Sequence, residues 1–231
     1  MKLTFAVTVY NRYDLLLESF AGIISDERID EILVMDDCSE DKYWNKIKDL
    51  PKFNPKIKVV RQASNRGMSE NKRDAVFNSK HDWVILADSD NVFDKRYIDA
   101  LMNVKSFVPE IIYCPSFAAP NFDYRKYQGN SYFKSSSFEL LFQETEFSCL
   151  MNTCNYVVNR EAYLKAWVEN KTIKCADTIW FNYLWLKAGN GFFIVPDMHY
   201  NHRVHNGSGF LEDISYNMAN AEKIKKLITE L

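Results

Sequence analysis

The chain has 231 residues, of which 47% are hydrophobic and 26% are charged, a composition that excludes a disordered chain and suits one α/β domain with a buried core. The net charge of -2 gives no general attraction to nucleic acid or to an anionic membrane, so neither is expected as a partner. No apolar run approaches the ~20 residues that a transmembrane segment requires.

Strands and helices alternate in the first part of the chain. The β-rich runs that predict strands are Leu3–Val9, Glu31–Met35, Ile57–Arg61 and Trp83–Ala87. The patterns that predict helices lie between them, at Tyr13–Ile24, Tyr43–Leu50 and Ser69–Ser79. This order predicts a Rossmann-like, mostly parallel sheet with helices on both faces. The strand runs are nearly continuous in apolar residues, as expected for strands that are covered on both faces.

The second part of the chain mixes the two kinds of element. Asp94 is expected to cap a helix, and a strand is expected at Glu110–Cys114. Residues 115–137 combine Pro, Asn, Gly and Ser with aromatic rings, which is typical of a loop. The later elements are helices at Arg160–Val168, at Asp177–Lys187 and from Leu211 on, and a strand at Gly191–Val195. No repeat or linker divides the chain, so we expect a single domain over residues 1–231.

The cysteines and the N-terminal sequence bear on location. An odd number of cysteines without a CxxC pair indicates reduced, mostly buried thiols and a cytoplasmic protein. They are Cys38, Cys114, Cys149, Cys154 and Cys175. The N-terminal sequence shows no signal-peptide cleavage pattern. The glycosylation triplets at Asn170 and Asn206 are therefore interpreted as chance matches.

A group of polar residues follows each of the first four predicted strands. Ligands of an open parallel sheet bind at the carboxyl ends of the strands, so these groups would share one edge. The groups are Thr8, Tyr10 and Asn11; Asp36 and Asp37; Asn65, Arg66 and Gly67; and Asp88, Asp90 and Asn91. One such group would be ordinary turn chemistry, but four together predict a ligand cleft. Asp88 and Asp90 place two like charges at the end of a buried strand, where unpaired charge is costly.

The motifs resemble, in order, those of GT-A glycosyltransferases of the large family 2. "FAVTVYNR" resembles the family's opening strand, and "ILVMDDCSED" resembles its "VDDGSTD" segment. "NRGMSENKRDAV" is similar to "N-x-G-x-S-x-x-R-N-x-G", and "WVILADSDN" is similar to the Asp-x-Asp strand. "CADTIWFNYLWLKAG" resembles the helix that begins with Glu-Asp, and "HRVHNGSG" is similar to a late "YRxHxxS" segment. The matches run from residue 4 to about residue 208.

The resemblance implies one GT-A domain that transfers a sugar from a nucleotide-diphosphate donor, expected to be UDP-linked, to a hydroxyl of a glycan or another acceptor. The transfer would depend on a metal and invert the anomeric centre. Residues of about 1–113 would bind the nucleotide, about 114–210 would bind the acceptor, and 211–231 would form a C-terminal helix. The rings expected to flank the acceptor are Phe117, Phe122, Tyr124, Tyr127 and Tyr132. The sugar, the acceptor and the oligomeric state stay open.

The implied cofactor is Mn²⁺ or Mg²⁺, which would neutralise the two carboxylates. Both ions prefer oxygen ligands and are commonly held by one or two carboxylates plus phosphate oxygens. The resemblance places the cation on Asp90, and it places Asp88 on the donor ribose or on a metal-bound water. His205 is expected as a further ligand of this cation or as a partner of the diphosphate. The alternative for the Asp-x-Asp segment is an ordinary Asx turn.

The resemblance also assigns the donor site. Asp37 would accept a hydrogen bond from the uracil N–H, and Tyr10 is either a ring stacked on the base or a half-buried aromatic at a strand end. Lys72 stands where the family usually carries Arg, so it offers the diphosphate a point charge in place of a fork, and Arg73 is the alternative. Thr8, Asn65 and Ser89 complete the predicted donor contacts.

Asp177 is the candidate general base. Transfer with inversion needs a group within hydrogen-bond reach that takes the proton from the attacking hydroxyl. The family carries Glu-Asp at this position and uses the second acid, whereas this chain has Ala176 and Asp177. The alternative for Asp177 is an N-cap of the helix that follows. A zinc site of His199, His202 and His205 is not expected, because no cysteine supports it.

Three other functional classes fit parts of the sequence. A phosphatase of the haloacid dehalogenase type would use Asp88 as a nucleophile, but its motif belongs on the first strand, not on the fourth. A nucleotidyltransferase would begin with a Gly-rich basic turn, which "TVYNRYD" is not. A non-catalytic nucleotide-sugar binding module would keep Asp37 and Asp90 but lose the base, so that alternative depends on Asp177.

Overall fold

The computed structural model describes residues 1–134, 137–173, 175–205, 208, 211 and 213–231. Within these residues nine strands form one sheet in the order β3-β2-β1-β4-β8-β5-β9-β7, with β6 beside β5. The strands are β1 (Leu3–Val9), β2 (Ile29–Asp36), β3 (Ile57–Arg61), β4 (Trp83–Asp88), β5 (Ile111–Ala119), β6 (Phe122–Asp123), β7 (Ser131–Phe133), β8 (Tyr156–Asn159) and β9 (Gly191–Asn201). The mixed α/β architecture confirms the predicted fold class.

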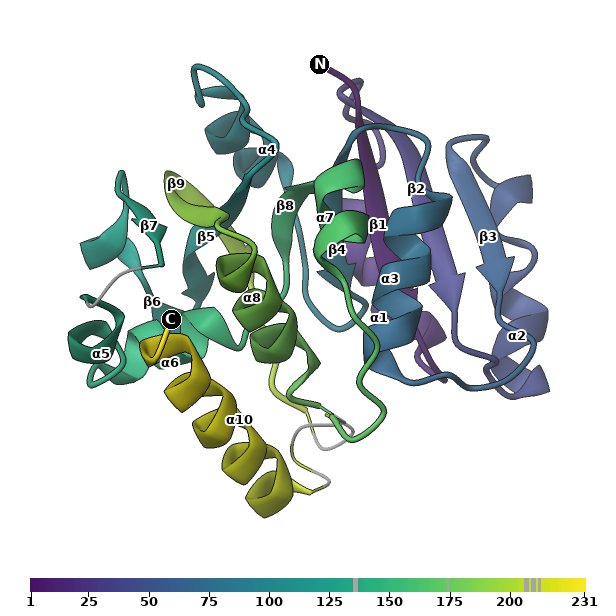
Figure 1. The fold of residues 1–231 in the computed structure, drawn as a ribbon. Helices are drawn as coiled ribbons and strands as arrows, with labels where there is room; N and C mark the ends of the chain where they lie inside the picture. The colour runs from purple at the N-terminus through teal and green to yellow at the C-terminus, as the bar shows by residue number, and fades with distance from the viewer. Residues whose placement is uncertain (135–136, 174, 206–207, 209–210, 212) are drawn as a thin grey trace.

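Helices cover both faces of the sheet. Figure 1 shows α3 (Met68–Asn78), α7 (Arg160–Ala166) and α8 (Asp177–Lys187) in front of it, with α10 (Ile214–Thr229) beside α8. On the other face, the ring of Phe93 packs against Phe5 of β1 and Tyr97 of α4 (Lys95–Met102), and the Phe93 N–H donates to the Ser19 carbonyl of α1 (Tyr13–Ala21). The remaining helices are α2 (Asp41–Ile47), α5 (Ser137–Leu141), α6 (Thr145–Met151) and the short 3₁₀ helices η1 (Leu50–Lys52) and η2 (Arg125–Tyr127).

The parallel half of the sheet aligns its carboxyl ends. β1 lies between β2 and β4, and all three are parallel, with Thr8 opposite both Met35 and Asp88. These strands are apolar on both faces, and Phe5, Val34 and Leu86 have no exposed surface, as the continuous apolar runs predict. β3 is parallel to β2, so the loops after β1, β2, β3 and β4 meet at one edge.

Antiparallel pairs join the rest of the sheet. β8 is antiparallel to both β4 and β5, so β5 runs in the same direction as β4. β9 is parallel to β5, whereas β6 and β7 run the opposite way. Among the described strands, β6, β7 and β8 are the exceptions to the mostly parallel arrangement. β8 is a short "YVVN" run directly before a helix, and the sequence interpretation missed it.

Two expectations about local structure are wrong, and one is confirmed. Residues 115–134 are not a loop, because β5 continues to Ala119 and β6, η2 and β7 follow. Tyr124 is 0% exposed and Tyr127 is 4% exposed, so these two rings belong to the core and do not flank an acceptor. Asp94 caps α4 as predicted, since its side chain accepts a hydrogen bond from the Arg96 N–H at 2.9 Å.

The cysteines are free, as predicted, but Cys114 and Cys154 alone are buried and the other three are intermediate in exposure. Among the described residues, no helix combines the length and apolar character needed to cross a membrane. Asn206 and Gly207 of the second glycosylation triplet lie outside the described residues, as do parts of the "HRVHNGSG" segment and of residues 115–137.

Candidate active site

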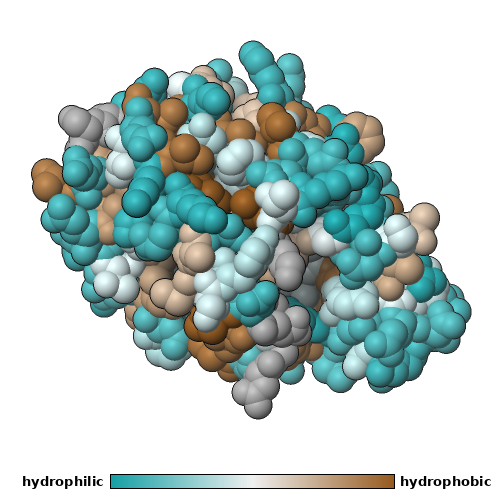
Figure 2. All heavy atoms as spheres, turned by 60° about the horizontal axis from the view of Figure 1, so that its bottom comes forward, coloured by the Kyte–Doolittle hydropathy of each residue, from teal (hydrophilic) through white to brown (hydrophobic). Residues whose placement is uncertain are grey.

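The predicted site residues lie at the edge of the sheet where β1, β2 and β4 end. Figure 2 turns this edge toward the viewer, and hydrophilic side chains make up most of this face. Thr8 is half-buried on β1, and the ring of Tyr10 is 45% exposed beyond its end. Asp88 is the last residue of β4, and Asp90 follows in the loop. Ser89 between them is 3% exposed, so its side chain points into the protein.

Lys72 of α3 connects Asp88 to Asp177. Its Nζ lies 3.2 Å from Asp88 Oδ1, 3.0 Å from Asp177 Oδ2 and 3.3 Å from Thr178 Oγ1. Burial opposes the charge on Lys72, but Asp177 and Asp88 prevail and hold its pKa well above the ordinary value. Burial, with Asp90 and Asp177 nearby, raises the pKa of Asp88 despite the opposing Lys72. The ammonium of Lys72 thus forms ion pairs with two carboxylates.

Asp177 is not the cap of its helix. It is the first residue of α8, the N-cap position belongs to Ala176, and no side chain caps this end. The carboxylate of Asp177 is 5% exposed and lies against Lys72. The capping alternative is therefore wrong, because a cap would sit one residue earlier and bond backbone N–H groups.

Asp90 pairs with two basic side chains. Arg12 Nη1 donates to Asp90 Oδ2 at 2.8 Å, and His205 Nε2 lies 3.1 Å from the same oxygen. The structure thus brings the predicted pair of Asp90 and His205 together. It also adds Arg12, which the sequence interpretation missed although it directly follows the Tyr-Asn turn after β1.

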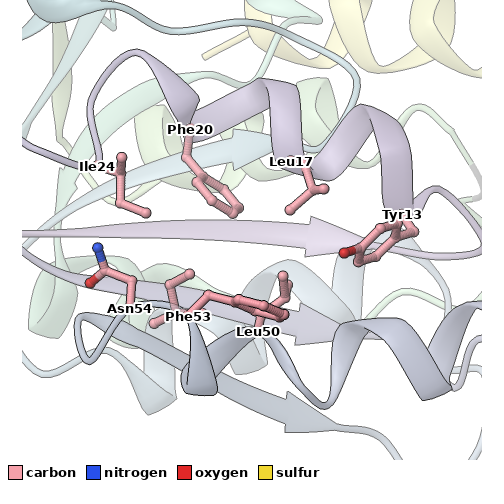
Figure 3. A pocket seen from close by; sticks show the side chains of 8 residues that line it. Tyr13, Leu17, Phe20, Ile24, Leu50, Phe53 and Asn54 are labelled. Atoms are coloured by element: carbon pink, nitrogen blue, oxygen red, sulfur yellow. The ribbon is translucent and has the colours of Figure 1, made fainter.

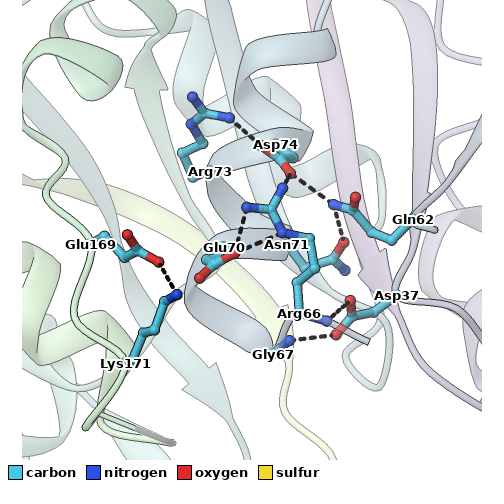
Figure 4. Close-up of polar contacts among 10 residues, drawn as sticks. All are labelled: Asp37, Gln62, Arg66, Gly67, Glu70, Asn71, Arg73, Asp74, Glu169 and Lys171. Carbon is cyan, nitrogen blue, oxygen red and sulfur yellow. Dashed lines mark hydrogen bonds and ion pairs between the residues drawn. The ribbon is translucent and has the colours of Figure 1, made fainter. Parts of the chain in front are cut away.

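Asp37 anchors the loop that leads into α3. Figure 4 shows its two oxygens facing the backbone of Arg66 and Gly67, whose N–H groups donate at 2.8 and 2.9 Å. Burial raises the pKa of Asp37, and these two hydrogen bonds oppose the shift. Gly67 has a φ of 86°, which favours glycine there. Asn65, one residue before this anchor, is exposed. Each carboxylate oxygen keeps a lone pair for a further donor.

Buried asparagines fix the loop that follows β4. Asn155 Oδ1 accepts from the Asp88 N–H at 3.0 Å, and the Asn155 carbonyl accepts from the Tyr97 hydroxyl at 2.9 Å. Asn91 Oδ1 accepts from the Arg203 N–H at 3.2 Å. Asn155 has a φ of 70°, a conformation that Asn tolerates better than most residues. The sequence interpretation missed Asn155, because its role depends on the pairing of β8 with β4.

α10 holds the segment that leads to Asp177. The Asn217 side chain is 0% exposed, and its Oδ1 accepts from the Cys175 N–H at 3.4 Å. The Tyr216 hydroxyl donates to the Thr172 carbonyl at 2.7 Å. The C-terminal helix therefore fastens the backbone two residues before the candidate base.

Arg73 and the remaining histidines lie apart from these clusters. Arg73 pairs with Asp74 and lies over the rings of Phe77 and Trp167, so it does not replace Lys72. His199 Nδ1 lies 3.0 Å from the Asp197 carbonyl, and His202 Nδ1 lies 2.8 Å from Asn121 Nδ2. In the described part of the chain, no three His, Cys, Asp or Glu side chains gather closely enough to hold a metal.

The predicted metal set of Asp88, Asp90 and His205 is therefore only partly assembled. Asp90 and His205 are in contact, whereas Asp88 pairs with Lys72. This arrangement still suits Mg²⁺ or Mn²⁺, which commonly take one or two protein carboxylates and complete their coordination with phosphate oxygens and water.

Two hollows lie outside the polar clusters. A groove of about 320 Å³ is lined mostly by apolar side chains such as Leu17, Phe20 and Phe53, with Asn54 at its edge (Figure 3). It offers no charged side chain to a nucleotide. A second hollow of about 370 Å³ lies at the ends of β5 and β9. Its lining includes Phe117, the one predicted acceptor ring among its residues, together with Arg125 and His199.

The sequence profile of Glycosyl transferase family 2 matches residues 4–168, which is more than half of the chain. The chain belongs to glycosyl transferase family 2. None of the curated proteins matches this family 2 chain.

Solved glycosyltransferase structures share the GT-A fold of this family 2 domain. S. aureus TarS 1-349 in complex with UDP-GlcNAc has a TM-score of 0.71 at 16% identity, over 99% of this chain and 65% of that one. Mannosyltransferase PcManGT from Pyrobaculum calidifontis, in complex with GDP-Man and Mn²⁺, has a TM-score of 0.66 at 13% identity, over 99% and 69%. GalNAc-T7 with UDP, GalNAc and Mn²⁺ has a TM-score of 0.66 at 14% identity, over 87% and 44%. Another structure of S. aureus TarS 1-349 is also covered over 65% of its length, so this chain spans slightly less than two thirds of that protein.

Proposed function

We propose that this family 2 domain is a metal-dependent glycosyltransferase that moves a sugar from a UDP-linked donor to a hydroxyl of a glycan or another acceptor, with inversion. The observation that carries the proposal is the position of Asp177. Although Asp177 is distant from Asp88 in sequence, Lys72 Nζ lies within 3.2 Å of a carboxylate oxygen of each. A candidate base thus lies beside the carboxylate expected at the donor.

The donor side supports a nucleotide sugar. The exposed ring of Tyr10 offers a stacking surface for the base, and the oxygens of Asp37 keep lone pairs for a base N–H. Thr8, Asn65 and Ser89 belong to the strand ends and loops around these two residues. The similar structures that contain UDP, UDP-GlcNAc and GDP-Man support the same class of donor.

Asp90 and His205 would hold the divalent cation, with Asp88 near it. The fit rests on the donor set: Asp90 is 15% exposed, the His205 ring lies beside its Oδ2, and hard cations favour carboxylate oxygen. When bound, the cation stabilises the negative charge that builds on the leaving diphosphate. The Mn²⁺ of the GalNAc-T7 and PcManGT structures supports this part of the proposal.

The chain's own residues would carry the proton. Asp177 accepts it from the acceptor hydroxyl, whose oxygen attacks the anomeric carbon opposite the diphosphate. One displacement inverts that centre. The acceptor would bind along residues of about 114–210, where the hollow beside Phe117 lies, while residues of about 1–113 bind the nucleotide. A cytoplasmic location is proposed on the free thiols.

The alternatives make different demands. A non-catalytic binding module needs no base, and the carboxylate of Asp177 beside Asp88 favours the enzyme. A phosphatase with Asp88 as nucleophile conflicts with the family match and with the place of the motif on β4.

Calorimetry with UDP and with GDP, each with Mn²⁺ and with EDTA, tests the donor and the cation. We expect UDP to bind more tightly than GDP, and only with the cation. A panel of nucleotide sugars, scored for hydrolysis, then identifies the donor without an acceptor. Equal affinity in EDTA would contradict the metal role, and a retained anomeric configuration by NMR would contradict inversion.

A further inference from the structure

Three acceptor oxygens of the protein itself surround the ammonium of Lys72. An ammonium group carries three donors, and three acceptor oxygens of the chain lie within 3.3 Å of Nζ. They belong to Asp88, Asp177 and Thr178. A diphosphate oxygen could bind Lys72 only by displacing one of these partners.

The burial of Lys72 also disfavours a contact between its ammonium and a diphosphate. Its side chain is 7% exposed, whereas that of Asp88 is 31% exposed and that of Arg12 is 27% exposed. A diphosphate would meet the guanidinium of Arg12, the more exposed cation, before Lys72. Breaking a buried pair also leaves an uncompensated charge, which is strongly unfavourable.

We infer that Lys72 is a positioning residue that holds the carboxylate of Asp177 beside Asp88, and that it is not a ligand of the diphosphate. This inference rests on the proposed function and deepens it. No capping hydrogen bond fixes Asp177 at the start of α8, so its contact with Lys72 orients it. Lys72 also joins α3, β4 and α8, and thereby ties the donor side of the cleft to the base.

The chemistry of lysine suits this task. Its ammonium is compact and can donate in three directions, whereas a guanidinium donates within one plane. The three acceptors come from a strand end and from two successive residues of a helix, and a rotating ammonium meets them without a planar constraint.

Lys72→Met, which keeps most of the side-chain length but removes the charge, is the main test. We expect the turnover number for transfer to fall by about 100-fold, the scale of a misplaced catalytic group. The affinity for UDP with Mn²⁺, measured by calorimetry, should stay within about threefold of the wild type, because that binding is not expected to use Lys72. UDP affinity that falls more than about tenfold with the turnover number little changed would overturn the inference in favour of a diphosphate ligand.

A double variant separates positioning from simple stability. Asp177→Asn in the Lys72→Met background should cost little extra rate, since residues that act as a unit give non-additive losses. Losses that multiply would show independent roles and overturn the inference. If Lys72→Met does not fold, Lys72→Arg keeps the charge: lowered transfer with preserved UDP affinity supports positioning, and lowered UDP affinity overturns it.

The two proposals fail in different ways. A wild-type protein that binds no nucleotide and hydrolyses no nucleotide sugar would overturn the proposed function. An active wild-type enzyme whose Lys72→Met variant transfers sugar at the normal rate would overturn only the role of Lys72.

Discussion

Replacing Asp177 with Asn removes the candidate base while keeping its size and one acceptor oxygen. The cluster holds two carboxylates and one ammonium, with Lys72 Nζ 3.0 Å from Asp177 Oδ2 and 3.2 Å from Asp88 Oδ1. After the substitution one carboxylate balances the ammonium, and the Asn oxygen can still accept from Lys72. We therefore expect the free energy of unfolding to stay within about 1 kcal/mol of the wild type.

The transfer rate should fall far more than the stability. Loss of a general base costs about 10²–10⁴-fold, which corresponds to about 3–5 kcal/mol in the activation barrier. The affinity for UDP with Mn²⁺ should change little, because Asp177 is expected to contact the acceptor and not the nucleotide.

Initial rates at saturating donor, with calorimetry and urea unfolding alongside, provide the assay. Asp49→Asn is the matched control, since it makes the same chemical change in a surface pair with Lys52 (2.7 Å) away from the cleft. A near-normal rate in Asp177→Asn would refute its role as base. An Asp177→Asn variant that does not fold would refute the argument that one carboxylate is enough to balance the Lys72 ammonium.

Four further predictions follow from the contacts described above. Asp90→Asn should weaken UDP binding in Mn²⁺ by at least about 10-fold without affecting any residual binding in EDTA, as calorimetry would show. Tyr10→Ala should weaken UDP binding by about 1–3 kcal/mol, because the base loses its stacking partner. The Tm should not change, because the ring is 45% exposed. Unchanged UDP affinity would show that Tyr10 does not contact the base. Asn217→Ala should lower the turnover number about 10-fold with UDP affinity preserved, because it releases the backbone before the base; equal turnover would contradict the role of α10. The hydrogen bond from Arg28 lowers the pKa of Asp26 from 3.8 to about 2, so this pair stabilises the folded state above pH 3.8 and loses its effect as the pH falls through about 2. Asp26→Asn should therefore lower the free energy of unfolding by about 1–2 kcal/mol at pH 7 and by much less at pH 2, as urea titrations at both pH values would show.

Local patterns in the sequence were enough to predict the elements of the parallel half. β1 and β3 have the predicted bounds, and α8 begins and ends where its pattern does. A strand buried on both faces must be apolar along its length, so its signal lies in consecutive residues. The same logic identified the polar ends of the strands, because ligands of such a sheet bind at that edge.

Segments that depend on partners far along the chain were not predictable in this way. β8 is four residues long and is a strand because β4 and β5 lie on either side of it. Residues 115–134 carry the composition of a loop, yet β9 pairs with both β5 and β7 and makes this region part of the sheet. Composition reports local preference, and tertiary pairing overrides it.

The sequence by itself determined which residue types follow the strands and open the helix: the carboxylates after β2 and β4, the ring after β1, and an acid at the start of α8. Only the tertiary structure decided their partners. Lys72 forms a buried ion pair with Asp177. Asp90 accepts a hydrogen bond from Arg12, on the loop after β1. These pairs join residues far apart in the chain, and their distances depend on how the strands are ordered and how α8 crosses the sheet. A residue's chemistry is local, whereas the charge that it faces is a property of the fold.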